Sequence, residues 1–182
     1  LIQSQDRSYY IGCSDTSMVV GNWKTKTFEK WWLEKLGLNK NNLSNEAMKA
    51  GNNYEHKILD SLEIVNLEKD KQIIKDRLRA NLDGNTNTCI YEVKTHNIDK
   101  EFKVSKQYWR QAQVEMYASG IHKLYIVAYG LQENDYNNYF NEIDKNRLEL
   151  INVDYDKEFI ENEYLPKLEI LTECLKKGVF PE

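Results

Sequence analysis

Apolar and polar residues alternate along this chain with two periods, one typical of helices and one typical of strands. Helical spacing of apolar residues, together with capping residues, predicts helices over 14–20, 25–36, 44–65, 105–120 and 158–177. Ser14 is expected to cap the first of them. Strict alternation predicts a buried strand over 123–131, with weaker strands over 139–143 and 147–154. This order of elements predicts an α/β (α+β) fold in which helices flank a central mixed sheet.

A pair of strands near the middle of the chain carries the most informative polar residues. Two runs of β-forming residues, 73–82 and 89–93, flank the turn-like sequence Asp83-Gly84-Asn85. Such a hairpin would bring Asp83 beside Glu92, and Lys94 would project from the same strand face as Glu92. The spacing is equally compatible with an exposed hairpin in which Glu92 and Lys94 form an ordinary ion pair.

These three side chains suit the hydrolysis of a phosphodiester. The carboxylates of Asp83 and Glu92 are hard oxygen ligands for Mg²⁺, for which Mn²⁺ is expected to substitute. Such an ion makes hydroxide available near neutral pH and neutralises charge on phosphorus, while the Lys94 ammonium orients the nucleophile. The tripeptide Glu-x-Lys begins at residues 55, 92 and 101, but only the middle copy follows a turn and a strand.

Two residues on predicted helices are candidates to complete this site. Glu55 falls on the apolar stripe of helix 44–65, where a buried carboxylate needs a metal or a basic partner. The stripe consists of Met48, Gly51, Ile58, Leu59 and Leu62. Gln111, on helix 105–120, could bond the attacking water or a phosphate oxygen. The ordinary alternatives are a glutamate that reaches solvent from the stripe edge and a glutamine that makes a packing contact.

Composition and charge narrow the class of protein. The 182 residues, 41% hydrophobic and 30% charged, fit a single domain over 1–182. The net charge of −4 argues against a protein that coats nucleic acid, although a nuclease needs only a local basic patch. Residues 94–110 contain five basic and two acidic residues, a local charge of +3. The candidates for contact with the DNA backbone are Lys100, Lys103, Lys106, Arg110 and Gln113.

The cysteines and the hydropathy pattern suggest a cytoplasmic protein. Cys13, Cys89 and Cys174 are scattered, without the paired spacing of a zinc or iron–sulfur site, and they fit a reducing compartment. No apolar run reaches the length of a membrane span, and no signal peptide is apparent. No membrane partner is therefore expected.

Five short motifs, taken in order, resemble the phage recombination exonucleases. This is the lambda exonuclease or YqaJ-type family of the PD-(D/E)xK nucleases, which have a restriction-endonuclease-like core. The motifs are Ile11-Gly12-Cys13-Ser14-Asp15, Gly51-Asn52-Asn53-Tyr54-Glu55, Asn81-Leu82-Asp83-Gly84, Tyr91-Glu92-Val93-Lys94 and Tyr108-x-x-Gln111-x-Gln113. The later strands and the last helix also fit, so the likeness covers most of the chain. The residues after Lys94, namely Thr95 and His96, are not diagnostic.

The resemblance implies roles for individual residues. Asp83, Glu92 and the Val93 carbonyl would hold the metal, and Glu55 would support a second metal region. Lys94 would position or activate water with help from Gln111. Arg7 and Ser14 match the family's pocket for the 5′-phosphate of a DNA end. The resemblance also implies a ring-shaped homotrimer, a single-strand annealing protein as partner, and a phage or prophage protein in a bacterial host.

The function expected from this sequence is a Mg²⁺-dependent deoxyribonuclease that digests duplex DNA from its 5′ ends and leaves 3′ single strands for recombination. A RecB-like or restriction-type endonuclease on the same core is the nearest enzymatic alternative. A non-catalytic module that binds DNA ends is an alternative from another class, although such a module has no need of Asp83, Glu92 and Lys94 together.

Overall fold

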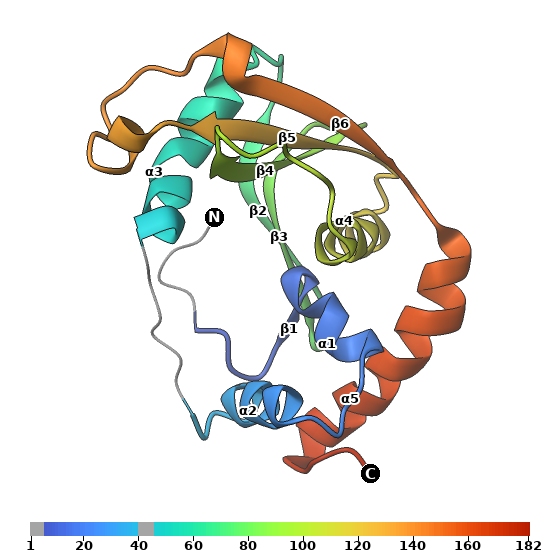
Figure 1. The fold of residues 1–182 in the computed structure, drawn as a ribbon. Helices are drawn as coiled ribbons and strands as arrows, with labels where there is room; N and C mark the ends of the chain where they lie inside the picture. Colours follow the sequence, from blue (N-terminus) through green and yellow to red (C-terminus); the bar gives the residue numbers. More distant parts are fainter. Residues whose placement is uncertain (1–5, 40–45) are drawn as a thin grey trace.

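The computed structural model describes residues 6–39 and 46–182, and these residues form a six-stranded mixed sheet (Figure 1). The strand order is β1-β3-β4-β5-β6, and β2 pairs with β3 outside this path. β1 runs parallel to β3 and β4 runs parallel to β5, whereas the other pairs are antiparallel. The strands are β1 (Ile11–Gly12), β2 (Glu68–Lys75), β3 (Leu78–Asn85), β4 (Ile90–Asn97), β5 (Lys123–Leu131) and β6 (Leu148–Asp154).

Helices cover both faces of this sheet, which confirms the predicted fold class. They are α1 (Thr16–Val20), α2 (Lys26–Lys35), α3 (Glu46–Ser61), α4 (Lys106–Ser119) and α5 (Leu165–Lys177), the last preceded by a π-helical segment, Phe159–Tyr164. Capping residues in the sequence fix the ends of several helices. The side chains of Thr25 and Ser105 accept hydrogen bonds from the first turns of α2 and α4, and Gly120 ends α4 in the left-handed conformation.

The side chains of β5 pack against helices on both faces of the sheet. Leu124 and Ile126 pack with Met116 of α4 on one face, whereas Val127 and Tyr129 pack on the other face with α3 residues. Successive side chains of a strand point to opposite faces, so a strand buried on both faces is apolar throughout. Accordingly, α3 and α4 lie on opposite sides of the sheet (Figure 1).

A third cluster of apolar residues forms at the end of the sheet near β1. Phe28 and Trp32 of α2 pack there with Leu171 and Leu175 of α5, and with Ile11 of β1. Figure 1 shows α1, α2 and α5 gathered at this end. This cluster fixes β1 and the turn that follows it, which carries Ser14.

Three expected boundaries in the first half of the chain are wrong. Residues 83–85 are the end of β3 and not a turn, since the reversal of the chain comes at Thr86–Thr88, where the Thr86 hydroxyl accepts amide hydrogen bonds. The run 73–82 is two strands, separated at Asp76, whose φ is +53°. The predicted start of helix 44–65 lies outside the described residues. The helix ends at Ser61 and not at residue 65.

Ser14 does not cap a helix, contrary to expectation. It lies inside a short 3₁₀ turn, Cys13–Asp15, which precedes α1. The carboxylate of Asp15 accepts the amide hydrogen of Gly12 at 2.9 Å, and the Thr16 hydroxyl donates to the Cys13 carbonyl at 2.6 Å. These bonds satisfy the local backbone without the Ser14 hydroxyl, which remains exposed.

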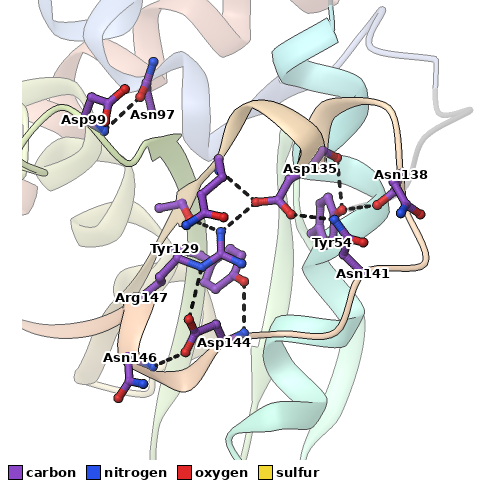
Figure 2. Close-up of polar contacts among 12 residues, drawn as sticks. Tyr54, Asn97, Asp99, Tyr129, Asp135, Asn138, Asn141, Asp144, Asn146 and Arg147 are labelled. Carbon is purple, nitrogen blue, oxygen red and sulfur yellow. Dashed lines mark hydrogen bonds and ion pairs between the residues drawn. The ribbon is translucent and has the colours of Figure 1, made fainter.

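The strand expected over 139–143 is also wrong, because that segment belongs to an irregular connection between β5 and β6. A buried ion pair holds this connection, with Arg147 Nη1 2.7 Å from Asp135 Oδ2 (Figure 2). The Tyr54 hydroxyl of α3 donates to the Asp135 carbonyl at 3.0 Å, and the Asp144 amide donates to the Tyr129 hydroxyl at 3.1 Å. Side chains therefore satisfy backbone groups that a strand would have paired.

In the part of the chain that the structure describes, no helix is long and apolar enough to cross a membrane.

Candidate active site

β3 and β4 are paired only near the turn that joins them. β3 and β4 pair at Gly84 with Tyr91 and at Asn85 with Ile90, and the ladder stops there. Beyond that point the side chain of Asp83 replaces the missing backbone partner, because its Oδ2 accepts the Val93 amide hydrogen at 2.9 Å. Asp83 is 6% exposed and Glu92 is 5% exposed. The predicted proximity of Asp83 to Glu92 is confirmed, and an exposed hairpin is excluded.

A network of polar contacts connects β4 with α4 through Lys94, Gln111 and Glu92. Lys94 Nζ donates to Gln111 Oε1 at 2.9 Å, and Gln111 Nε2 donates to Glu92 Oε1 at 3.1 Å. The Lys94 Nζ atom also lies 3.4 Å from Glu92 Oε1 and 4.5 Å from the centre of the Tyr108 ring. The Gln111 amide thus holds the ammonium in one orientation.

Glu55 approaches the site from α3, on the other side of β3 and β4. Its predicted burial is confirmed at 6% exposure, and its charge is one of those that act on Asp83. The apolar stripe around it is less regular than expected, since Met48 is half exposed whereas Ile58 and Leu59 are fully buried. A Cβ atom on Gly51 would lie 3.1 Å from the Thr95 hydroxyl of β4, so the glycine allows α3 to lie close to this strand.

Glu115 is a member of this site that the sequence did not single out. It lies one helical turn after Gln111 and is completely buried. Neither of its carboxylate oxygens accepts a hydrogen bond from the described residues, and the group that faces it is the Glu92 carboxylate. Spacing alone places Glu115 on the same helix face as Gln111, but only the packing of α4 against β4 shows that this face meets the acidic strand.

The electrostatics of the cluster favour a cation. Burial raises the pKa of Asp83 well above its ordinary value, and the charges of Glu92 and Glu55 add to this, against the bond from Val93. Burial also raises the pKa of Glu115, with Glu92 as the next cause. For Lys94, burial alone would lower the pKa, but Glu92 and Asp83 outweigh it, so the pKa lies above its ordinary value and the ammonium stays charged.

The donor set fits a small, hard divalent ion. Glu92 Oε2 is buried and accepts no hydrogen bond from the residues described in the structure, so it is an orphaned carboxylate oxygen. With Asp83 and Glu55 close by and Lys94 as the neighbouring cation, the carboxylates outnumber the bases. An oxygen-rich acidic set of this kind matches the ligands that Mg²⁺ uses.

A second group with metal-binding atoms adjoins the first through Glu55. Glu55, His56 and Asp70 each place a ligand atom within 4.8 Å of the others, and His56 Nε2 contacts Asp70 Oδ2 at 2.6 Å. Asp70 belongs to β2, between Lys69 and Lys71, which pair with Gly84 and Leu82 of β3, and it has a φ of +57°. Glu55 therefore lies between two acidic groups.

The expected DNA-contacting residues divide into accessible and buried ones. Lys100, Lys103 and Lys106 are exposed and precede or begin α4, and Arg110 reaches the Ser17 hydroxyl at 3.4 Å. Gln113 is fully buried, donates to the Asp154 carbonyl and accepts from the Asp156 amide. Because both ends of its amide fix the segment after β6, Gln113 is a structural residue, and its assignment to the DNA backbone is wrong. Arg7 and Ser14 are both exposed.

Comparison with known proteins connects this arrangement to one family. Residues 4–122 match the family model described as the YqaJ-like viral recombinase domain. The matched region includes Arg7, Ser14, β3, β4 and all of α4. No curated protein matches the sequence significantly.

Solved structures share the fold at low sequence identity. An alkaline exonuclease from Laribacter hongkongensis is 20% identical, with a TM-score of 0.64 over 94% of this chain and 93% of that one. The same enzyme in complex with dAMP gives the same values. A phage-related exonuclease from Haemophilus somnus 129PT is 18% identical, with a TM-score of 0.64 over 93% and 92% of the two chains. These likenesses establish the fold, whose order of strands and helices carries the acidic cluster described above.

Proposed function

We propose that this chain, which belongs to the YqaJ-like viral recombinase domain family, is a metal-dependent exodeoxyribonuclease that hydrolyses duplex DNA from its ends. One observation carries the proposal: a lysine ammonium is held by a glutamine beside an orphaned, buried carboxylate oxygen, next to a second buried carboxylate. A binding module has no use for such a set, because burying unpaired carboxylates is costly.

Each residue then has a distinct role in hydrolysis. Asp83, Glu92 and the Val93 carbonyl would hold a divalent ion, with Glu55 beside them. When bound, the ion would supply a nucleophile from water near neutral pH and offset negative charge on the phosphate. Lys94 orients the water by hydrogen bonding, and Gln111 fixes the ammonium that does so. Arg7 and Ser14 bind the 5′-phosphate of the DNA end, and the exposed lysines before α4 contact the backbone.

The finer features of the proposal rest on family membership and on the neighbours. We assign Mg²⁺ as the ion, digestion from 5′ ends, and 3′ single strands as the product for phage-type recombination. The exonuclease neighbour in complex with dAMP supports release of mononucleotides. A ring-shaped trimer and a single-strand annealing partner belong to the same proposal, as does action in the cytoplasm of a bacterial host.

Linear and closed circular duplex DNA test the proposal directly. The linear substrate carries a label at its 5′ end, and each substrate is incubated with the protein in Mg²⁺ or in EDTA. We expect degradation of the linear DNA in Mg²⁺ alone, with the circle resistant. Cleavage of the circle would identify an endonuclease on the same core, and binding to DNA ends without cleavage in Mg²⁺ would identify a non-catalytic module.

A further inference from the structure

Three side chains with metal-binding atoms meet between α3 and β2. Glu55 and His56 are consecutive on α3, and Asp70 belongs to β2. One ligand atom of each residue lies within 4.8 Å of the other two, and the described part of the chain contains no other group of three such residues. Neither His56 nor Asp70 has a role in the nuclease site proposed above. The cluster adds an imidazole nitrogen to two carboxylates, whereas Asp83 and Glu92 offer oxygen alone.

The backbone of Asp70 departs from regular strand geometry at this cluster. Its φ of +57° lies in the left-handed region, which is uncommon for residues other than glycine. Its two neighbours on β2 still pair with β3, so the departure is confined to one residue. The Oδ2 atom of Asp70 lies 2.6 Å from His56 Nε2. This single residue therefore connects β2 to the imidazole of α3.

The lysines next to these residues in the sequence bind elsewhere. Lys57 Nζ donates to two backbone carbonyls in the connection between β5 and β6. Lys69 forms an ion pair with Asp60, and Lys71 forms one with Glu68. The three ammonium groups are therefore engaged outside the cluster. Two carboxylates and one imidazole keep an excess of negative charge even when the imidazole is protonated, and this excess favours a cation.

The cluster is open to solvent on one side and buried on the other. The side chain of His56 is 52% exposed and that of Asp70 is 27% exposed, whereas Glu55 is 6% exposed. A metal ion can therefore enter beside the imidazole, as a binding site requires. The Glu55 carboxylate lies at the buried end of this path.

The size and the donor atoms of the cluster fit a divalent transition metal. Ligand atoms about 2.0 to 2.2 Å from one ion lie roughly 3 to 4 Å from each other. The separations of up to 4.8 Å would close with a side-chain movement of roughly 1 Å, which the exposed imidazole allows. An imidazole nitrogen favours first-row transition metals, whereas Mg²⁺ prefers oxygen ligands.

We propose that Glu55, His56 and Asp70 bind a divalent transition-metal ion such as Mn²⁺ or Zn²⁺, at a site separate from the one proposed for Asp83 and Glu92. The ion would link α3 to β2. Three protein ligands would leave coordination positions for water or for a phosphate oxygen of DNA. This inference concerns metal binding and does not depend on the proposed nuclease activity.

Binding of Mn²⁺ in excess Mg²⁺ tests this site. The Mg²⁺ occupies the all-oxygen site, so bound Mn²⁺ reports on the site with the nitrogen ligand. Metal-free protein without DNA is titrated with Mn²⁺, and the free ion is measured by electron paramagnetic resonance. His56→Gln removes the nitrogen ligand, and Asp70→Asn removes one charge with a residue that tolerates the left-handed conformation. His122→Gln is the control, because His122 is also exposed and packs on the Tyr155 ring.

The wild type and His122→Gln should each bind a single Mn²⁺ per chain, and Zn²⁺ should displace it, because affinity rises from Mn²⁺ to Zn²⁺. His56→Gln and Asp70→Asn should weaken Mn²⁺ binding roughly 10-fold or more, since even loss of an outer-shell partner commonly costs that much. Glu92→Gln should keep this binding. Thermal melting checks that each variant is folded.

Two results would overturn the inference. The first is no bound Mn²⁺ in the wild type, or equal binding by His56→Gln and His122→Gln, which would leave His56 and Asp70 as an ion pair only. The second is loss of this binding in Glu92→Gln, which would mean that the two sites are one. Because no cleavage is measured, either result leaves the test of the nuclease proposal independent.

Discussion

The position of one nitrogen atom, Lys94 Nζ, is central at the scale of single residues. It contacts Gln111 and Glu92 and lies over the Tyr108 ring, so its rotamer is set from three sides. A positioned ammonium stabilises developing charge without reorganising during the reaction. Lys94 should therefore contribute to turnover far more than to binding.

Substitution of Lys94 by alanine tests whether this residue contributes to turnover more than to DNA binding. We expect Lys94→Ala to lower kcat by roughly 100- to 1,000-fold, because one preorganised electrostatic contact to the reacting group is lost. Affinity for DNA should change little. Lys157→Ala serves as the control, since Lys157 is exposed, pairs with exposed Glu161 and has no proposed contact with DNA. Weaker DNA binding with normal turnover in Lys94→Ala would make Lys94 a phosphate clamp.

The buried carboxylates also predict how the stability of the metal-free protein depends on pH. The pKa values of Asp83 and Glu115 are raised in the folded state above the ordinary 3.8 and 4.5, so the folded state holds more protons than the unfolded one. The contribution of these two groups to the free energy of unfolding should then be complete below those ordinary values and be lost as pH rises through the raised values. Metal binding should oppose the fall, because it neutralises the same cluster.

Melting temperatures between pH 5 and pH 9 in EDTA measure this effect. Glu115→Gln should flatten the decline, since it removes one buried ionisation, and it should raise the melting temperature at pH 8. Glu101→Gln, an exposed carboxylate, should leave the curve unchanged. A wild-type melting temperature that rises steadily over this range would refute the assignment.

At the scale of elements, the sequence predicted those parts of the fold whose signals are local. The end signals of α2, α4 and β5 are capping residues and strict alternation, and these boundaries agree with the structure. β1 was missed because two residues, Ile11–Gly12, are too few to show a period. The break at Asp76 and the absence of a strand over 139–143 depend on tertiary contacts, which a single sequence does not display.

The same limit applies to the candidate site. Asp83, Glu92 and Lys94 were recognisable because all three lie on one pair of strands. Glu115 looked like an ordinary helical glutamate, since its burial depends on which sheet face α4 covers. Gln113 was misassigned because two glutamines two residues apart point in different directions, and only the structure shows that Gln113 faces Asp154.

The connection between β5 and β6 offers a stability prediction at this scale. Arg147→Met should cost about 3 kcal/mol of unfolding free energy, because it leaves the carboxylate of Asp135 buried without its cation. Urea denaturation measures the loss. Lys145→Met, which removes an exposed charge paired with exposed Glu63, should stay within about 0.5 kcal/mol of the wild type. Equal effects of the two substitutions would mean that the buried pair does not hold this connection.

At the scale of the whole molecule, the net charge of −4 requires the proposed contact with DNA to be confined to a local region. The exposed lysines before α4 provide such a region beside Lys94. Each phosphate that they neutralise should add about −0.9 to the slope of log K against log salt concentration. Lys103→Gln combined with Lys106→Gln should therefore make the slope less steep by about 1.8. Lys157→Gln combined with Lys177→Gln, at the far end of the chain, should not change it, and equal slopes for all three proteins would place the DNA elsewhere.

The acidic site itself is tested most directly by one substitution that preserves shape. Glu92→Gln keeps the size of the side chain but removes the charge of the orphaned oxygen, and Glu149→Gln on β6 is the exposed control. Cleavage of end-labelled linear duplex DNA in Mg²⁺ is measured for both variants and for the wild type. We predict that Glu92→Gln falls to background with its fold intact, and that Glu149→Gln cleaves like the wild type. Cleavage by Glu92→Gln at a rate near that of the wild type would contradict the proposed site.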